Sequence, residues 1–374
     1  MRYYVIAGEA SGDLHGSNLI RELQQVDTAA DIRCWGGDKM QATGARLVKH
    51  YRELAFMGFT EVLKNLGTIF KNLRFCKADI LQYKPDTLIL IDYPGFNLRI
   101  AEWAKQQGLK VIYYISPQEW AWKANRVKMM KQCIDKMICI LPFEKKYYKD
   151  KWNWEVEYVG HPLVEVIEEF RINSLELRVE TPYGGNIIAL LPGSRKQEIL
   201  KKLPIMLEVA KDFPAYQFIV AKAPGLEESF YNELLAPYNN VSSVMNKTYA
   251  LLAQAKAALV TSGTATLETA LFGVPEVICY KGNSLSYHIA KRLIKIKFIG
   301  LVNLIMDKEV VKELIQNDLT PKNLQQELER LLTDGAKQQQ LKEDYAALKR
   351  LLSEGGHASA NAAKSIYHFL KLPQ

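Results

Sequence analysis

The stretch AALVTSGTATLETALFGVPEVICY, Ala257–Tyr280, carries the clearest fold signal in the chain. Its apolar pattern predicts a short buried strand at Ala258–Val260, a helix at Ala265–Phe272 and a second strand at Val277–Tyr280. The first strand and the helix are joined by Thr261-Ser262-Gly263-Thr264. A helix that begins after such a loop presents free backbone N–H groups and the positive end of its dipole. The stretch therefore predicts a strand–helix–strand unit with a place for a phosphate or diphosphate.

Two interpretations of this loop are open. A plain capped helix between two strands would need only Thr264 as its cap. A binding role would also engage Ser262, Gly263 and Glu268, because a carboxylate one turn into the helix can hold two hydroxyls of a ribose. Strand–loop–helix anion sites are common in α/β proteins.

Composition limits the class of protein. The 374 residues are 48% hydrophobic, enough for two cores, and no apolar run reaches the roughly 18 residues of a membrane span. The strand-like start leads us to expect no signal peptide. Five scattered cysteines and six histidines show no metal-ligand spacing, so we expect reduced thiols and no metal. The net charge of +8 and pI near 9.0 favour an anionic partner: a nucleotide, a phospholipid surface or a nucleic acid.

Strand and helix signals alternate along the chain, which predicts parallel sheets. Ile167–Gly185 reads as a linker, because it is charged and closes on TPYGG. We predict an α/β fold of two Rossmann-like domains that face each other across a cleft, at residues 1–168 and 185–352. Helix 356–374 would pack back on the first domain. The main predicted strands are Tyr3–Ala7, Ile32–Trp35, Thr87–Ile91, Lys110–Ile115, Met137–Leu141, Val156–Val159, Ile187–Leu191, Tyr216–Val220 and Val241–Val244. A helix is predicted at Pro204–Phe213.

A second anion-suited loop follows the first strand of the second half. It is Pro192-Gly193-Ser194-Arg195, and ligands of open α/β sheets bind at the carboxyl ends of strands. The guanidinium of Arg195 can clamp a phosphate through two parallel hydrogen bonds. The alternative is a surface arginine in a turn. The chain has no dinucleotide fingerprint or P-loop motif in a suitable place, which disfavours those two classes.

The first half offers a counterpart loop, Gly8–Asp13, and a strand-end acid, Asp92. Small residues let a backbone approach a ligand closely, and Glu9, Ser11 and Asp13 supply polar contacts. Ser11 or Asp13 could instead be only a helix cap. Asp92 is placed either for general-base work on a hydroxyl or for an Asx turn.

Two stretches combine bulky apolar and cationic residues, Leu54–Phe75 and Tyr287–Phe298. This pattern suits the interface of an anionic bilayer, although core-facing amphipathic helices are the alternative for each. A nucleic-acid groove is disfavoured, since no polar base-reading face appears. The candidate lipid-facing residues are Phe56, Met57, Phe59, Ile69, Phe70, Lys291, Arg292 and Lys295.

Nine motifs in order carry a resemblance to the lipid-A-disaccharide synthases over nearly the whole chain. They are AGEASGD (Ala7–Asp13), FMGFTEVL (Phe56–Leu63), KPD…ID.PGFN (Lys84–Asn97), YYISPQEWAW (Tyr113–Trp122), LPFEKKYY (Leu141–Tyr148), VGHPL (Val159–Leu163), LLPGSRKQEI (Leu190–Ile199), SGTATLE (Ser262–Glu268) and AKRLIKIKFIGLVNL (Ala290–Leu304).

The resemblance implies a GT-B glycosyltransferase at the inner face of the cytoplasmic membrane, in contact with anionic inner-membrane lipids. It would transfer 2,3-diacylglucosamine from UDP-diacylglucosamine to 2,3-diacylglucosamine 1-phosphate (lipid X). The products would be a β(1→6) tetraacyl disaccharide 1-phosphate and UDP. Such an enzyme inverts the anomeric carbon and needs no metal or other cofactor. No pattern specifies an oligomeric state.

The resemblance also assigns roles. Asp92 would be the base for the acceptor 6-hydroxyl. The donor side would comprise Gly193, Ser194, Arg195, Ser262, Gly263, Thr264, Glu268 and Asn303, and the acceptor side Glu9, Ser11, Gly12, Asp13 and Asn97. Gly95 stands where many members have Asp, which leaves Asp92 the only acid of its loop.

Two other readings fit some of these features. A UDP-sugar epimerase or a glycosyltransferase with a soluble acceptor would share the diphosphate loop but would not need the lipid-suited stretches. A non-catalytic nucleotide-binding or membrane-scaffold protein would not depend on Asp92.

Overall fold

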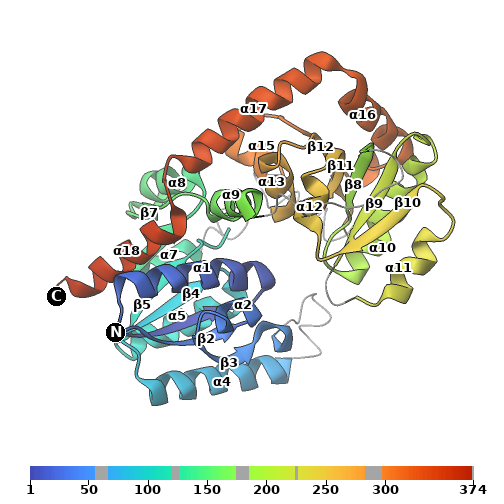
Figure 1. Cartoon of the computed structure of the whole chain (residues 1–374). Helices are drawn as coiled ribbons and strands as arrows, with labels where there is room; N and C mark the ends of the chain where they lie inside the picture. The colour runs from blue at the N-terminus through green and yellow to red at the C-terminus, as the bar shows by residue number, and fades with distance from the viewer. Residues whose placement is uncertain (55–65, 119–125, 174–184, 224–225, 283–296, 373–374) are drawn as a thin grey trace. The chain divides into compact units, whose positions relative to one another are not determined.

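A computed structural model describes residues 1–54, 66–118, 126–173, 185–223, 226–282 and 297–372 (Figure 1). Its contacts divide the chain into two compact units. Unit 1 consists of Met1–Pro162 and Ser353–Gln374, and unit 2 of Leu163–Leu352. Each unit is built on one parallel sheet.

The sheet of unit 1 has the strand order β3-β2-β1-β4-β5-β6-β7, all pairs parallel. Its strands are β1 (Arg2–Ala7), β2 (Asp31–Gly36), β3 (Arg46–His50), β4 (Thr87–Ile91), β5 (Lys110–Tyr114), β6 (Lys136–Cys139) and β7 (Glu157–Tyr158). The helical elements are α1 (Ala10–Val26), α2 (Asp38–Gln41), η1 (Tyr51–Glu53), α4 (Leu66–Tyr83), α5 (Pro94–Gln106), α7 (Arg126–Cys133), α8 (Pro142–Trp152) and α18 (Ala358–Lys371).

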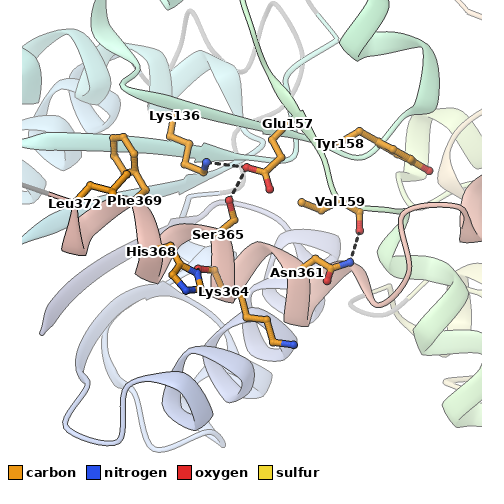
Figure 2. Close-up of a pocket in the computed structure, with 10 residues that line it drawn as sticks. All are labelled: Lys136, Glu157, Tyr158, Val159, Asn361, Lys364, Ser365, His368, Phe369 and Leu372. Carbon is orange, nitrogen blue, oxygen red and sulfur yellow. Dashed lines mark hydrogen bonds and ion pairs between the residues drawn. The ribbon is translucent and has the colours of Figure 1, made fainter.

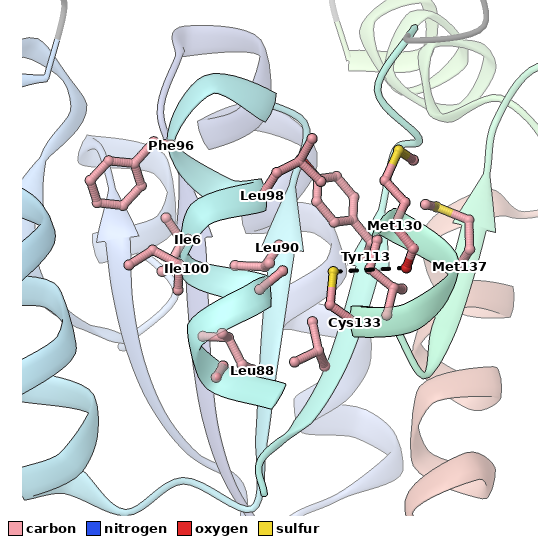
Figure 3. Packing of buried hydrophobic residues seen from close by; sticks show 14 of the residues in the cluster. Ile6, Leu88, Leu90, Phe96, Leu98, Ile100, Tyr113, Met130, Cys133 and Met137 are labelled. Carbon is pink, nitrogen blue, oxygen red and sulfur yellow. Dashed lines mark hydrogen bonds between the residues drawn. The ribbon is translucent and has the colours of Figure 1, made fainter. Parts of the chain in front are cut away.

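The core of unit 1 lies between the central strands and the helices that cover them. Every residue of β4 is buried, as a strand covered on both faces requires. Leu88 and Leu90 of β4 belong to one cluster with Ile100 of α5 and Met130 of α7 (Figure 3). This packing holds the β4–α5 connection, which carries Asp92, on a rigid support.

Helix α18 returns to unit 1 and lies beside α1. The chain reaches it through a close backbone contact that only glycines allow. A Cβ on Gly355 would lie 2.1 Å from the backbone nitrogen of Gly160, and Gly160 itself has a φ of +97°. Asn361 Nδ2 then donates to the carbonyl of Val159 at 3.4 Å.

The sheet of unit 2 has the order β10-β9-β8-β11-β12-β13, again parallel throughout. Its strands are β8 (Ile187–Leu191), β9 (Gln217–Lys222), β10 (Val241–Met245), β11 (Ala255–Thr261), β12 (Glu276–Tyr280) and β13 (Lys312–Ile315). The helical elements are α9 (Pro162–Asn173), α10 (Lys196–Ala210), α11 (Glu228–Leu235), α12 (Thr248–Leu252), α13 (Thr264–Leu271), α15 (Leu301–Met306), η2 (Gln316–Asp318), α16 (Pro321–Thr333) and α17 (Gly335–Ser353).

The predicted α/β class with two parallel sheets is confirmed. Three local predictions are wrong. The expected loop Gly8–Asp13 ends early, because α1 begins at Ala10. The expected linker from Ile167 is helical through Asn173. The helix expected at Pro204–Phe213 begins earlier, at Lys196, and contains Pro204 in its interior. The proline removes one backbone hydrogen bond, and the buried apolar face of the helix compensates for that loss.

Within the described residues, no helix combines the length and the apolarity that crossing a bilayer requires.

Candidate functional site

The site of unit 1 forms where β1 and β4 end side by side. Ala7 is in register with Ile91, so Glu9 and Asp92 follow at the same edge of the sheet. The strand order 3-2-1-4 reverses direction between these two strands. In open α/β sheets, this switch point is where ligands bind.

The backbone at Asp92 is strained and held in place from several sides. Asp92 and Tyr93 both have left-handed φ values, +44° and +50°. Such a conformation costs a non-glycine residue about 1–2 kcal/mol and persists only where its surroundings enforce it. The Asp92 N–H donates to the carbonyl of Tyr114 at 3.3 Å, and its own carbonyl accepts from Tyr113 Oη at 2.5 Å. Gly8 is required beside it, since a Cβ there would lie 2.3 Å from the Tyr93 ring.

Burial raises the pKa of the Asp92 carboxyl to about 7, and the carboxylate of Glu9 adds to this rise. A hydrogen bond from the backbone of Tyr93 acts in the opposite direction. A carboxyl with a pKa near neutrality is well matched to accept a proton from a substrate hydroxyl at physiological pH.

Asn97, on the first turns of α5, positions this strand end. Its side chain is fully buried, and Nδ2 lies within hydrogen-bonding reach of three carbonyls: Ile6 (3.4 Å), Ile91 (3.1 Å) and Asp92 (2.8 Å). Asn97 therefore ties the ends of β1 and β4 together. Contact between Asn97 and an acceptor stays a prediction.

The other predicted acceptor-side residues fall into two groups. Asp13 is buried, and its carboxylate accepts from the N–H groups of Gly37, Lys39 and Met40, which fixes the start of α2. Gly12 lets α1 pack closely on β1, since a Cβ would lie 3.1 Å from that of Ala7. Asp13 and Gly12 therefore hold α1 against α2 and β1, which supports the site indirectly.

Glu9 and Ser11 are different. Ser11 is exposed and Glu9 is half-buried at the start of α1, where both can meet a ligand.

In unit 2, β8 and β11 form the equivalent switch point. Leu191 is in register with Val260, so the loops Pro192–Arg195 and Ser262–Thr264 leave the same edge of the sheet. Gly193 (φ +120°) and Gly263 (φ +149°) adopt conformations that favour glycine. Gly263 and Thr264 are exposed, and no heavy atom of the structure lies within 4 Å of a Cβ placed on Gly263. The start of α13 is therefore accessible to a ligand.

Three charged side chains lie in or next to the first turns of α10, close to Gly193: Arg195, Glu198 and Lys202. Arg195 occupies the N-cap position of α10, is half-exposed, and places Nη1 3.1 Å from Glu198 Oε1. A Cβ on Gly193 would lie 2.8 Å from Glu198 Oε2 and 3.6 Å from Lys202 Nζ. Lys202 is buried, and burial lowers the pKa of its ammonium.

Sequence reasoning missed Lys202. The available signal was a lysine on the apolar face of the helix, between Ile199 and Met206. A buried lysine beside an anion-suited loop brings a second cation to it.

Glu268 and Ser262 are the remaining predicted residues near the start of α13, and both side chains make hydrogen bonds within unit 2. Tyr249 Oη donates to Glu268 Oε1 at 2.8 Å, and burial raises the pKa of the Glu268 carboxyl. Ser262 Oγ donates to the carbonyl of Ile299 at 3.0 Å, which joins the loop to the start of α15.

Asn303, a buried residue of α15, fixes the start of that helix through hydrogen bonds to the segment that follows it. It is fully buried, with Oδ1 accepting from Val310 and Val311 N–H and Nδ2 donating to Val311 O and Glu313 Oε1. Glu313 in turn accepts from the N–H groups of Ile299 and Gly300. Asn303 therefore supports the wall next to Ser262, and its contact with a donor stays a prediction.

A cavity of about 470 Å³ in unit 1 lies away from the predicted site residues (Figure 2). It lies where α18 meets the start of β6 and the short strand β7. Lys136 and Ser365 both contact the carboxylate of Glu157 there. The cavity is lined by Lys136, Glu157, Tyr158, Val159, Asn361, Lys364, Ser365, His368, Phe369 and Leu372.

Helix α4 contributes to both the core and the surface. Leu73, Cys76 and Ile80 are buried, and Ile69 packs partly against the same core. On its outer side, large apolar side chains stand beside cations. These exposed residues are Phe70, Lys71, Arg74, Phe75 and Leu81. The remaining predicted lipid-facing residues, Phe56, Met57, Phe59, Lys291, Arg292 and Lys295, lie outside the described residues.

Solved structures share this architecture at low sequence identity. A glycotransferase of kitacinnamycin matches with a TM-score of 0.68 and 15% identity, covering 100% of this chain and 99% of that one. A UDP-GlcNAc 2-epimerase from Neisseria meningitidis, bound to UDP-GlcNAc, matches with a TM-score of 0.68, 13% identity and 99% coverage of both chains. These similarities show the fold, which is that of GT-B proteins.

Sequence relatives are more specific. A lipid-A-disaccharide synthase from Geobacter metallireducens is 38% identical over 361 residues, 95% of this chain and 94% of the relative. One from Nitrosococcus oceani is 39% identical over 360 residues, 94% of this chain and 92% of the relative. The family model described as lipid-A-disaccharide synthetase matches residues 3–366. The resemblance seen in the motifs is thereby confirmed, and the chain belongs to the lipid-A-disaccharide synthase family, glycosyltransferases of lipid A biosynthesis.

Proposed function

We propose that the chain transfers 2,3-diacylglucosamine from UDP-2,3-diacylglucosamine to 2,3-diacylglucosamine 1-phosphate with inversion at the anomeric carbon. The observation that carries the proposal is the chemistry at the two switch points. Unit 1 presents a half-buried acid whose pKa burial raises to about 7. Unit 2 presents a helix start next to a loop that carries an arginine, with a buried lysine beside that loop. The first is suited to activate an acceptor and the second to bind a diphosphate.

Asp92 acts as the base. Its carboxylate takes the proton of the acceptor 6-hydroxyl while that oxygen bonds to the anomeric carbon of the donor. The bond between the anomeric carbon and the UDP oxygen breaks, and its electron pair leaves with UDP. Attack opposite the leaving group gives the β(1→6) disaccharide 1-phosphate. One base is enough, because UDP departs as a stable anion.

The leaving diphosphate is stabilised by protein groups. The backbone N–H groups at Thr264 and the following residue open α13, and Arg195 and Lys202 add positive charge at the neighbouring loop. Groups held in position before the reaction stabilise developing charge without reorganisation. The proposed enzyme therefore needs no divalent cation, and Glu268 holds the ribose hydroxyls.

The outer side of α4 suits lipid substrates. Phe70, Phe75 and Leu81 are 55%, 48% and 51% exposed, and Lys71 and Arg74 lie among them. Apolar side chains with interspersed cations favour the interface of an anionic membrane. We place the enzyme as a peripheral protein on the inner face of the cytoplasmic membrane, where both diacyl substrates reside. A transferase with a soluble acceptor would have no use for this surface.

Replacing the proposed base tests the reaction itself. The purified protein, incubated with both substrates, should yield a tetraacyl disaccharide 1-phosphate by mass spectrometry. Asp92→Asn should lower kcat by about 10²–10⁴-fold, because an amide cannot accept the proton, while UDP affinity is retained. Asp86→Asn is the matched control, since Asp86 lies at the opposite end of β4, where its carboxylate accepts the Arg2 N–H. Turnover of Asp92→Asn within tenfold of the parent would remove Asp92 as the base.

The pH dependence tests the environment of that base. Asp92 must be deprotonated to work, so kcat/KM should rise tenfold per pH unit up to about pH 7 and then level off. Glu9→Gln removes a negative charge that raises the pKa of Asp92, so the rising limb should move to lower pH. Glu102→Gln, an exposed change on α5, should leave the limb in place. If the pH at which kcat/KM levels off is the same in Glu9→Gln as in the parent, Glu9 does not raise the pKa of Asp92.

Vesicle binding tests the α4 surface. Phe70→Ser with Phe75→Ser should reduce co-sedimentation with phosphatidylglycerol vesicles, since both remove exposed apolar area. Leu200→Ser, at a 46%-exposed leucine of unit 2, serves as the control. Equal sedimentation of the double variant and the control would argue against membrane contact through α4.

A further inference from the structure

We propose that Tyr249 is the positioning residue that orients the Glu268 carboxylate toward the ribose of the donor. The inference rests on the proposed function, in which Glu268 holds the ribose hydroxyls. A carboxylate that accepts two hydroxyls must present its oxygens in one orientation, and a glutamate side chain rotates about three bonds. Something must therefore fix it before the nucleotide binds.

The contact that fixes it is direct. Tyr249 lies in α12, and its Oη donates to Glu268 Oε1 at 2.8 Å. Burial raises the pKa of the Tyr249 phenol, so the hydroxyl keeps its proton and remains a donor. A hydrogen bond to one carboxylate oxygen restricts the rotation of the group and so the directions that its other oxygen can take. Hydrogen bonds to a charged group are also stronger than those between neutral groups.

The tyrosine ring is itself held by two aromatic side chains, one from α9 and one that directly follows α13. Phe170 of α9 meets it edge-on, with ring centroids 5.5 Å apart and planes at 81°. Phe272, the residue after α13, lies 5.3 Å away, and Phe170 and Phe272 contact each other at 5.9 Å. Edge-to-face contacts at these distances restrict ring movement.

Arg171 closes the cluster from the α9 side. Its Nη2 donates to the carbonyl of Leu271 at 3.1 Å, and its guanidinium lies 5.6 Å from the centre of the Phe272 ring. The end of α13 is thus joined to α9, and the same helix begins at the anion site. The position of the Tyr249 hydroxyl is determined by packing, independently of the nucleotide.

A purely structural Tyr249 would behave differently. Its ring would matter for packing and its hydroxyl would only satisfy Glu268, so Tyr249→Phe would affect all uridine nucleotides equally. A positioning role makes the hydroxyl matter only for ligands that carry ribose hydroxyls. The ratio of affinities for UDP and 2′,3′-dideoxy-UDP separates the two roles.

The experiment is calorimetry of the full chain with UDP and with 2′,3′-dideoxy-UDP. We expect the parent to prefer UDP, and Tyr249→Phe to reduce that preference about three- to tenfold, with affinity for the dideoxy nucleotide unchanged. Tyr238→Phe is the matched control, because Tyr238 Oη donates to Glu208 Oε1 at 2.7 Å on the surface of the same unit. It should keep the preference of the parent.

The outcomes separate this inference from the function beneath it. Loss of the preference in Glu268→Ala together with the parental preference in Tyr249→Phe would overturn the role of Tyr249 alone. A parent that binds both nucleotides equally would overturn the ribose role of Glu268 and this inference with it. A parent that binds no UDP would overturn the proposed function as well.

Discussion

The parallel pairing of the first and fourth strands of each sheet is the constraint on which the rest of the molecule depends. In unit 1 these are β1 and β4, and in unit 2 they are β8 and β11. The connections that follow two such strands run to opposite faces of the sheet, so their first residues meet at one edge with room between them. Loops that are more than 60 residues apart in the sequence become neighbours in this way.

Burial at the two edges acts on acids and on cations in the same manner, by disfavouring charge. It raises the pKa of Asp92 and Glu268 and lowers that of Lys202. At Asp92 the result is a base that can still be protonated near neutrality. At Lys202 it is a cation that gains from the arrival of a diphosphate. In the proposed mechanism, the same physical effect prepares one unit for proton transfer and the other for anion binding.

The sequence reveals those parts of the fold that follow from a local pattern. Thr87–Ile91 and Ile187–Leu191 are continuous apolar runs, and both are the strands that were predicted, residue for residue. The edge strands β3 (Arg46–His50) and β13 (Lys312–Ile315) were missed, because one-sided exposure leaves charged residues among their apolar ones. Residues at strand ends could be placed at an edge because the rule for parallel sheets is general.

The partners of those residues could not be read in the same way. Tyr249 lies 19 positions before Glu268 in a helix of five residues, too short to show a period. The acceptors for Asn97 and the three donors to Asp13 are backbone groups, which every sequence contains. Such contacts depend on how elements pack, and packing is not a local property.

The central claim is that protein groups alone take the charge of a departing diphosphate, and calorimetry of UDP binding in EDTA tests it most directly. The account predicts that the parent binds UDP without a divalent cation and that added magnesium does not improve affinity. Arg195→Ala should weaken binding about tenfold or more, as the loss of a charge-assisted contact does, while Lys196→Ala should not. Binding that requires magnesium, or an unchanged affinity in Arg195→Ala, would contradict it.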